Sequence, residues 1–589
     1  MARRHSSPMR RTPISISRVC TGVAGSFNSK RAGGTQRARK GADQYRYNIQ
    51  DLYLCHLSLL VPSVFPPLLK WYRSAPCEWH DAPWIEHKEG QTMKVLRTPR
   101  WKMVTVAAMS VASTLSARAA MAQGASPYVV STPAPAGFDR AQAQAATLEH
   151  IKALIGRNTQ NPPGNELLTA QYFDSVFAKI PGVERHVLPA GEGRANFVAR
   201  LRAANPTKRP VMIMGHMDVV GVDTAKWKTP PFTATIVNEP GVQYLYGRGA
   251  IDDKGMLSAA TAALQQLAAR RDQLDRDIIF LATAAEEGGP EVGIDEMVGK
   301  HFDLIKDAEF ALNEGGRVRV ADGRVMSVNI QTTEKVSYTV TALATGPSGH
   351  GSVPLPDNAL AALSRAAQRV HVWKAPVLLN ETTRLYFSRL ARIEKDPAMK
   401  AAMQRVSAPG ASKAQIDAAA AILSREPLHN AVLRTGQSLT IIKGGIRSNV
   451  IPSDGSATFN VRVLPNDDVR GIVTAFNRVG AEKQVKFTLD GEPRTSPPVS
   501  PVTTALYQAM EASALAMVPT TTVIPFMSTG ATDGAALRAK GIPTYGILPM
   551  PLPMEDELRM HGDNERVPVP ALGWAAEFLY RTLLRVTAR

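Results

Sequence analysis

The sequence contains little cysteine, and none of it lies beyond residue 77. Its 589 residues include three cysteines, Cys20, Cys55 and Cys77. The long remainder of the chain therefore can form no internal disulfide and can offer no thiolate to a metal ion. Any metal site in that remainder has to be built from imidazoles, carboxylates and other oxygen ligands.

The sequence also shows no apolar run long enough to cross a bilayer as a helix. The apolar run at residues 103–115 is too short, but it follows a basic stretch that starts at Met93 and precedes Ala120-Met-Ala122. Residues 93–122 thus have the three parts of a secretory signal peptide. We expect cleavage before Gln123 and a periplasmic or secreted protein without a membrane span. An exported chain without cysteine fits a bacterial periplasm.

Residues 1–92 mix Arg-rich, Ser-rich and Pro-rich pieces without a sustained helical or strand period. A signal peptide that begins at Met93 would not normally be presented to an export machinery. We therefore interpret residues 1–92 as a disordered extension from an over-extended gene start, with Met93 as the true initiator. The alternative is a genuine basic arm with an internal anchor.

Beyond residue 122 the chain has little excess charge of either sign. Residues 1–122 hold 19 Lys and Arg against 6 Asp and Glu, so the remaining residues carry +5 of the total net charge of +18. The basic excess lies in segments that we expect to be absent from the working protein. It is therefore no indication of nucleic-acid binding, and we expect no nucleic-acid partner.

Motifs of two other enzyme and binding classes are missing as well. No Gly-x-Ser-x-Gly follows a predicted strand, which argues against a serine hydrolase. The Gly-rich turn Gly247-Arg-Gly249 lacks the Gly-Lys-Ser/Thr ending of a phosphate-binding loop. Both classes are set aside.

What the sequence does have is a series of acidic residues and histidines that follow apolar, strand-like runs. Strands predicted at 211–216, 277–285 and 310–313 end at or just before His216, Glu286-Glu287 and Glu314, and Asp252-Asp253 lies on a Gly-rich turn before a predicted helix at 255–270. Ligands of open α/β sheets bind beyond the carboxyl ends of the strands. The pattern predicts an α/β fold with a mainly parallel central sheet and a metal site at the strand ends.

The chain divides into regions by its change of pattern. We predict a catalytic domain in two parts, residues 138–332 and 491–589, interrupted by a smaller α+β domain at 333–490. Alternating residues at 336–342 and 456–463 predict strands of the smaller domain. A Lys/Arg- and Ala-rich stretch at about 377–437 reads as a helical insertion, with Ser412 as the N-cap of one helix.

A series of separated motifs occurs in an order that resembles one family. They are His216-x-Asp218, Gly247-Arg-Gly-x-x-Asp252-Asp, Glu286-Glu287, Glu314-Gly, Gly349-His350, Ser448-Asn-Val-Ile-Pro452 and His561-x-x-x-Glu565. Over residues 138–589 the chain resembles the zinc metallopeptidases that include carboxypeptidases, aminoacylases, acetylornithine deacetylase and succinyl-diaminopimelate desuccinylase. The resemblance implies a zinc-binding α/β domain and a smaller lid or dimerisation domain.

The resemblance also implies roles for individual residues. One zinc ion would bind His216, Asp252 and Glu314, and a second would bind Asp252, Glu287 and His561, with Asp252 bridging. Nitrogen and oxygen ligands suit zinc, and cobalt or manganese could substitute. Asp218 would orient the His216 ring, and Glu286 would be the general base.

Three residues of the smaller domain are implied in substrate binding. His350 matches a histidine that reaches the scissile carbonyl, often from a partner subunit, so we expect a homodimer or a lid-closing monomer. Asn449 and Arg462 match positions that hold the substrate carboxylate. Some carboxypeptidase relatives carry an Arg near the linker after the lid, whereas this chain has Glu492 there, which argues against a glutamate-type specificity.

Several interpretations remain open. Taken singly, each of these histidines and acids is more often a hydrogen-bonded core residue or a solvated strand end than a ligand. The leading hypothesis is a secreted di-zinc carboxypeptidase or dipeptidase that cleaves an amide next to a free carboxylate in a small peptide or an N-acylated amino acid. The alternatives are an N-acyl amino acid deacylase and a catalytically silent binding protein on the same scaffold.

Overall fold

The computed structural model describes residues 126–589. The predicted extension at 1–92 and the predicted signal peptide at 93–122 lie outside the described residues. In the described part of the chain, no helix combines the length and the apolar character needed to cross a bilayer.

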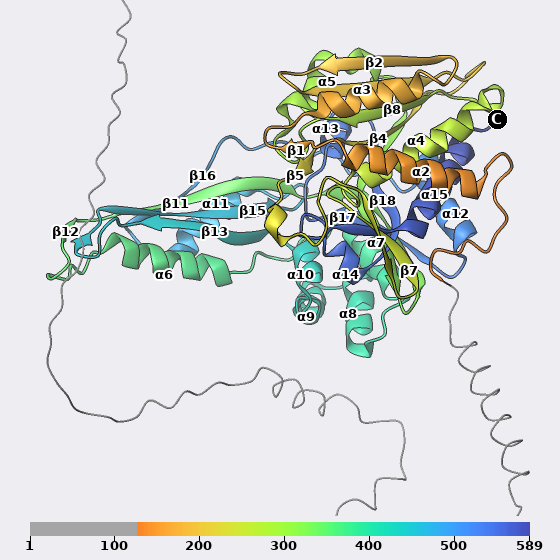
Figure 1. Ribbon diagram of the computed structural model, residues 1–589. Helices are drawn as coiled ribbons and strands as arrows, with labels where there is room; N and C mark the ends of the chain where they lie inside the picture. The colour runs from red at the N-terminus through yellow and green to blue at the C-terminus, as the bar shows by residue number, and fades with distance from the viewer. Residues whose placement is uncertain (1–125) are drawn as a thin grey trace, which may run out of the picture. The chain divides into compact units, whose positions relative to one another are not determined.

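A mixed eight-stranded sheet forms the centre of the larger domain (Figure 1). Its order is β17-β10-β18-β9-β4-β8-β3-β2, and neighbouring strands run parallel from β18 through β9 and β4 to β8. The strands are β2 (Val183–Pro189), β3 (Ala195–Leu201), β4 (Val211–His216), β8 (Ile278–Thr283), β9 (Phe310–Ala321), β10 (Arg324–Glu334), β17 (Thr522–Ser528) and β18 (Thr544–Pro553). The predicted fold class, an α/β domain with a mainly parallel centre and a separate α+β domain, is confirmed.

Both faces of this sheet are buried, so its central strands are apolar without interruption. On β4, Ile213 packs into one core, and Met212 and Met214 pack into another on the opposite face. The first core includes α2 (Arg140–Ile155), α3 (Glu166–Phe177), α4 (Lys254–Ala268), α12 (Ala505–Met517) and α15 (Val569–Thr587); the second includes α5 (Ile294–Lys300) and α13 (Gly534–Ala539). The alternation along β4 places successive side chains in different cores, as a strand geometry requires.

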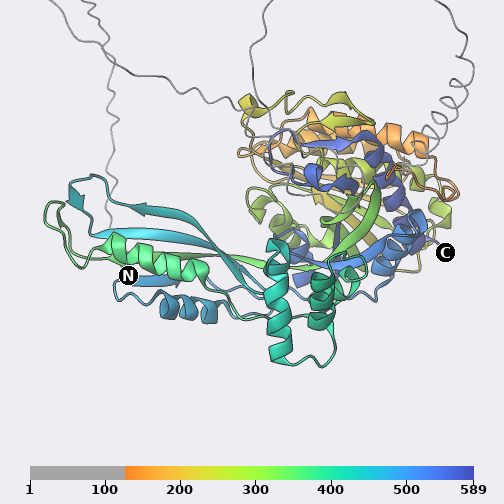
Figure 2. The same cartoon turned by 90° about the horizontal axis from the view of Figure 1, so that it is seen from below.

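The smaller domain is a four-stranded antiparallel sheet of order β13-β15-β11-β16. Its elements are β11 (Val336–Thr345), β13 (Gly436–Gly444), β15 (Asp454–Val463) and β16 (Val485–Leu489), with α6 (Ala359–Val372) and α11 (Val469–Gly480). The two helices pack together on the sheet, where they share one apolar core with it (Figure 2). A two-stranded ribbon, β12 (Gly349–His350) with β14 (Val450–Ile451), follows the end of β11.

The predicted helical insertion forms α7 (Glu381–Leu390), α8 (Pro397–Ser407), α9 (Lys413–Leu423) and α10 (Pro427–Leu433). In the sequence the insertion interrupts the smaller domain, but in the fold it packs on β17, the outer strand of the larger sheet. Ile524 and Phe526 of β17 belong to the apolar core of the insertion. The buried hydroxyls of Thr332 on β10 and Thr382 on α7 lie 2.8 Å apart and join the larger sheet to the insertion. The insertion therefore covers a sheet edge that would otherwise be open.

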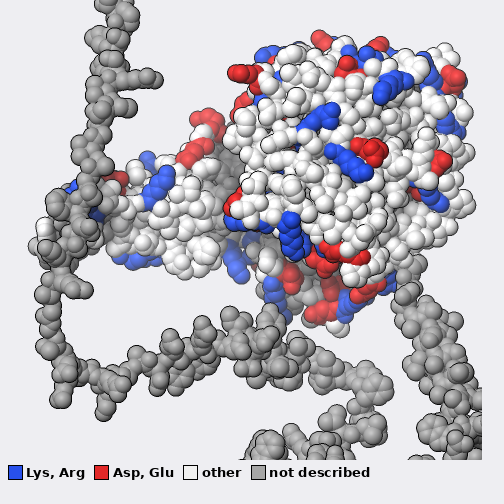
Figure 3. All heavy atoms as spheres, in the orientation of Figure 1, with Lys and Arg blue, Asp and Glu red and all other residues white. Residues whose placement is uncertain are grey.

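Short elements complete the fold. They are β1 (Gln160–Asn161), β5 (Val219–Val220), β6 (Thr235–Glu239), β7 (Val242–Tyr246), β19 (Arg566–Pro568) and α14 (Met554–Glu557), with 3-10 turns at Thr224–Lys226, Arg271–Gln273, Pro290–Val292 and Phe302–Leu304. On the face that Figure 3 shows, acidic and basic side chains are interspersed over a largely uncharged surface.

Candidate metal centre

Three of the six residues predicted as metal ligands or general base lie where strands of the larger sheet end. His216 is the last residue of β4, Glu286 and Glu287 follow β8, and Glu314 lies within β9, three neighbouring strands. Asp252 lies between β7 and α4, and His561 lies between α14 and β19, where its φ is +62°. Because β9, β4 and β8 are parallel, their carboxyl ends meet at one edge of the sheet.

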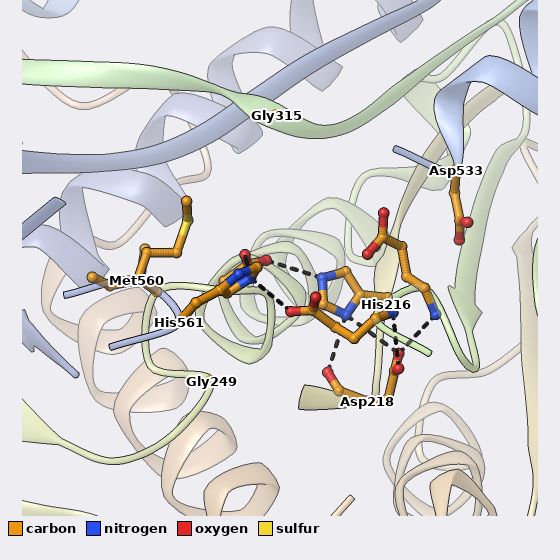
Figure 4. A network of polar contacts seen from close by, with 12 residues as sticks. His216, Asp218, Gly249, Gly315, Asp533, Met560 and His561 are labelled. Atoms are coloured by element: carbon orange, nitrogen blue, oxygen red, sulfur yellow. Dashed lines mark hydrogen bonds and ion pairs between the residues drawn. The ribbon is translucent and has the colours of Figure 1, made fainter. Parts of the chain in front are cut away.

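The imidazoles of His216 and His561 lie in one network of polar contacts (Figure 4). The Asp252 carboxylate lies between them. Its Oδ1 is 2.9 Å from Nε2 of His216, and its Oδ2 is 3.1 Å from Nε2 of His561. Nε2 of His561 is also 2.8 Å from Oε1 of Glu287. One carboxylate thus contacts both histidines through different oxygens, as a group that bridges two cations would.

The donor set fits divalent cations. Ligand atoms of His216, Asp252 and Glu287 all lie within 4.8 Å of one another. Beside them the carboxylate of Asp253 is completely buried, and neither of its oxygens has a hydrogen-bond partner. Burial together with the charge of Asp252 raises the pKa of Glu314 to about 8. So many buried carboxylates need added positive charge to be ionised together, and imidazole nitrogens with carboxylate oxygens are the ligands that zinc and similar metals take.

The acidic neighbours raise the pKa values of both histidines. Hydrogen bonding to Asp252 and Glu287 raises the pKa of His561 to about 10. Burial opposes the charged form of His216, but hydrogen bonds to Asp218 and Asp252 still hold its pKa well above the usual range. Burial would also raise the pKa of Asp252, whereas its bonds with the two histidines hold that pKa below the ordinary value. Each imidazole faces a site where a cation is electrostatically favoured.

Asp218 connects the strand end to the loop that carries the glutamates. Its backbone carbonyl lies 3.0 Å from Nδ1 of His216, which leaves Nε2 of the ring facing Asp252. Its carboxylate accepts hydrogen bonds from the backbone N–H groups of Glu286 and Glu287, each at 3.1 Å. Asn161 donates to the same carboxylate at 2.9 Å. This aspartate thereby fixes the ring and the loop together.

Sequence reasoning missed the partners that hold the Asp252 turn. The buried Glu565 accepts bonds from the N–H groups of Gly249 at 3.1 Å, Ile251 at 2.7 Å and Asp252 at 3.2 Å. Arg248 donates to it at 2.6 Å. Gly249 has a φ of +83°, which a glycine adopts without strain. Glu565 appeared in the sequence only as the end of the His561 motif, and no local signal linked it to a turn more than 300 positions earlier.

Glu286 and Asp533 lie next to the ligand cluster. Burial, with Glu314 and Asp533 as acidic neighbours, raises the pKa of Glu286 well above its usual range. Asp533 follows β17 and accepts a 2.6 Å hydrogen bond from the hydroxyl of Thr283. Burial raises the pKa of Asp533 to about 7. Sequence reasoning had given this carboxylate no role.

The structure separates the three predicted residues of the smaller domain. His350 is exposed and pairs through β12 with Val450, and the N–H of Gly351 donates to the carbonyl of Asn449 at 2.7 Å, so His350 and Asn449 lie together. Arg462 lies at the other end of the β11–β15 pair. Because β11 has 10 residues, the two ends are about 30 Å apart. Within one chain the sheet keeps His350 and Asn449 away from Arg462.

Comparison with known proteins places these features in a family context. The sequence profile of peptidase family M20/M25/M40 matches residues 212–585. The chain is 28% identical over 398 residues to a probable carboxypeptidase S-like 2 of Dictyostelium discoideum, covering 66% of this chain and 74% of that protein. It is 26% identical over 392 residues to the human N-fatty-acyl-amino acid synthase/hydrolase PM20D1, covering 65% and 75%.

Two solved structures share the fold. An M20 family metallo-carboxypeptidase from Sulfolobus solfataricus aligns with a TM-score of 0.54 at 20% identity, over 74% of this chain and 99% of that one. Human carnosine dipeptidase 1 aligns with a TM-score of 0.52 at 15% identity, over 76% and 98%. At these identities the likeness concerns the fold.

Proposed function

The chain belongs to peptidase family M20/M25/M40, and we propose that it is a two-metal hydrolase that cleaves an amide bond next to a free carboxylate. The observation that carries the proposal is the placement of Asp252 between His216 and His561. We assign one cation to His216, Asp252 and Glu314, and a second to Asp252, Glu287 and His561. The cations are zinc, which this donor set suits, with cobalt or manganese as chemical substitutes.

Bound there, the cations would supply Lewis acidity for the amide carbonyl and lower the pKa of a water molecule. The catalytic residue among the chain's own groups is Glu286. Its side chain takes the proton of the attacking water and delivers it to the leaving amine nitrogen. Its raised pKa, which burial causes, suits a group that holds a proton between these two transfers. Asp218 keeps both Glu286 and the His216 ring in place.

The names of two relatives define the substrate alternatives. One is a probable carboxypeptidase, which favours a small peptide, and the other is a hydrolase of N-fatty-acyl amino acids, which favours an N-acylated amino acid. Both classes present an amide beside a free carboxylate. The zinc-loaded full chain is therefore to be offered a panel of dipeptides and N-acyl amino acids, with Glu286→Gln as the control.

We expect hydrolysis of members of one class and a loss of at least 100-fold in Glu286→Gln, since a positioned base contributes about 100- to 10,000-fold. Equal turnover by the variant would remove Glu286 from the mechanism. Binding of the panel without turnover in the wild type would favour the silent binding protein.

We further propose that His350 acts across a homodimer. Within one chain it lies beyond one end of the smaller sheet, paired with Val450. Apolar side chains are exposed toward that end: Ile441 at 46%, Ile442 at 62%, Ile446 at 93% and Val450 at 42%. Two of them lie on β13, which is the outer strand of its sheet. An exposed, apolar outer strand is a surface on which a second copy can pair.

The test for action across the dimer mixes inactive Glu286→Gln subunits with inactive His350→Ala subunits. Hybrid dimers would contain one site with both residues intact, so partial activity should return. Demonstrated subunit exchange without recovery would contradict this role. Loss of one hydrogen-bond donor to a developing oxyanion costs about 100- to 1000-fold in turnover, which sets the size of the His350→Ala defect.

Export is the remaining part of the proposal. The signal-like pattern that begins at Met93 supports synthesis from that residue and a mature N-terminus near Gln123. Expression from Met93 in a Gram-negative host, followed by N-terminal sequencing of the periplasmic fraction, tests it. Native peptides from residues 1–92 would contradict the assigned start.

A further inference from the structure

Strand β9 is irregular where it carries Glu314. In its parallel pairing with β18, β9 advances four residues, from Asn313 to Arg317, while β18 advances two, from Gly546 to Leu548. The extra residues of β9 form a bulge, which we call the Glu314 bulge (residues 314–316). Bulges next to functional sites commonly redirect a side chain out of the regular pleat. Here the redirected side chain is a predicted metal ligand.

The backbone of the Glu314 bulge depends on two glycines and on one arginine. Gly315 has a φ of +125°, and a Cβ on Gly316 would lie 2.1 Å from the backbone oxygen of Asn329. Nη1 of Arg317 donates to the backbone carbonyls of Gly315 at 3.0 Å and Gly316 at 2.9 Å. One nitrogen of Arg317 therefore holds both glycine carbonyls of the bulge.

The same guanidinium contacts the chain that leads to His561. Its Nη2 donates to the thioether sulfur of Met560 at 3.2 Å, and its Nε lies 3.7 Å from Oε1 of Glu557, the last residue of α14. The side chain of Arg317 is 16% exposed and that of Glu557 is 14% exposed, so these contacts are shielded from solvent. A side chain of β9 thus contacts the residue that directly precedes His561.

The loop that carries His561, residues 558–565, needs such contacts. His561 has a φ of +62° and Asn564 has a φ of +58°, a backbone region that non-glycine residues adopt rarely and keep only where their surroundings hold them. The imidazole of His561 is 49% exposed, so packing around the ring gives little support. Asn564 is held by the N–H of Lys228 at 2.6 Å. Arg317 supplies a second contact, at the residue before the ligand.

We propose that Arg317 is a positioning residue that serves both cation sites at once, because it holds the bulge that presents Glu314 and the loop that presents His561. The inference rests on the proposed function in assigning Glu314 and His561 to different cations. Arg317 itself is assigned to neither cation. A guanidinium suits this task, since its N–H donors point in fixed and different directions, whereas a lysine offers a single nitrogen.

Amide hydrogen exchange of the EDTA-treated full chain, measured by mass spectrometry, tests the contacts without any metal ion. In Arg317→Gln, exchange should become at least about tenfold faster in residues 313–317 and in residues 558–565, because both segments lose a bond to a charged donor. Exchange in β15 of the smaller domain should stay as in the wild type. Equal rates in the two segments, or faster exchange throughout the chain including β15, would overturn the proposal.

Two further variants and a control separate the two contacts. Met560→Leu keeps a similar volume but loses the sulfur acceptor, so exchange should rise about three- to tenfold in residues 558–565 alone. Arg317→Lys keeps the charge but cannot reach both segments, so at least one of them should exchange faster; this variant replaces Arg317→Gln if the latter does not fold. Arg324→Gln is the matched control, because Arg324 is exposed on β10, and it should behave as the wild type.

Zinc affinity measures the effect on each cation separately. A Glu314→Gln background leaves the cation assigned to His561, and a His561→Gln background leaves the cation assigned to Glu314. Adding Arg317→Gln should weaken zinc binding about 10- to 100-fold in both backgrounds, as is typical when a residue that supports a metal ligand is replaced. Adding Met560→Leu should weaken it in the Glu314→Gln background alone. Unchanged affinity on adding Arg317→Gln to either background would overturn the role in both sites.

Wild-type activity separates this proposal from the proposed function. Hydrolysis of an amide by the wild type, with unchanged exchange and zinc affinity in Arg317→Gln, would refute the positioning role and leave the hydrolase. Two bound zinc ions and the expected Arg317→Gln effects, without hydrolysis of any amide by the wild type, would refute the hydrolase and leave the positioning role.

Discussion

Replacement of Glu565 by glutamine should loosen the turn that presents Asp252, although Glu565 itself is assigned to neither cation. One of its oxygens accepts from the N–H groups of Ile251 and Asp252, and the other accepts from Gly249 and Arg248. A glutamine amide has one oxygen, so in either orientation two buried donors lose their acceptor. The NH₂ group would also face those donors with its own hydrogens.

The size of the effect depends on which two hydrogen-bond donors lose their acceptor. Each unsatisfied buried donor costs about 1 to 3 kcal/mol, so two backbone N–H groups cost about 2 to 6 kcal/mol. Leaving the buried Arg248 unpaired would cost about 3 to 5 kcal/mol for that charge alone, so the amide oxygen should turn to Arg248. The N–H groups of Ile251 and Asp252 then lose their acceptor. Metal affinity should fall about 10- to 100-fold, as is typical when a residue that supports a metal ligand is replaced.

The assay combines urea unfolding of the EDTA-treated chain with a zinc competition titration. Glu555→Gln is the matched control, because it replaces a glutamate by glutamine at an exposed position of α14. Its effect on the free energy of unfolding should stay within about 0.5 kcal/mol. Wild-type zinc affinity and stability in Glu565→Gln would refute the role of this carboxylate as the support of the Asp252 turn.

Two further results are expected. Asn161→Ala removes a donor to Asp218 and should lower kcat about 10- to 100-fold while the circular dichroism spectrum stays unchanged; an unchanged kcat would show that Asp218 needs no such support. Ser412→Ala should reduce the stability of α9 by about 1 kcal/mol, measured by amide hydrogen exchange, and full protection in the variant would contradict the cap.

Local sequence signals predicted the elements that carry the site. The strand predicted at 211–216, which ends at His216, matches β4. The predicted N-cap at Ser412 is confirmed: its side chain accepts from the N–H of Gln415, whose own side chain reaches back to it. These elements are defined by hydrophobic period and capping chemistry within a few residues, which a sequence displays directly.

Features that depend on distant residues were missed. The strand predicted at 310–313 is too short, because β9 continues to Ala321 through pairing with β10 and β18 despite its Glu-Gly-Gly interruption. The supports at Asn161 and Glu565 arise from contacts far apart in the chain. Only the tertiary fold brings such groups together.

The proposed mechanism requires that Asp252 bind two cations and that Glu286 bind none. Metal content of the dialysed, zinc-loaded full chain, measured by inductively coupled plasma mass spectrometry, tests it in the wild type, Asp252→Ala and Glu286→Gln. We expect two zinc ions per wild-type chain, loss of both in Asp252→Ala, and two in a Glu286→Gln protein without turnover. One zinc ion retained in Asp252→Ala, or zinc lost from Glu286→Gln, would contradict it.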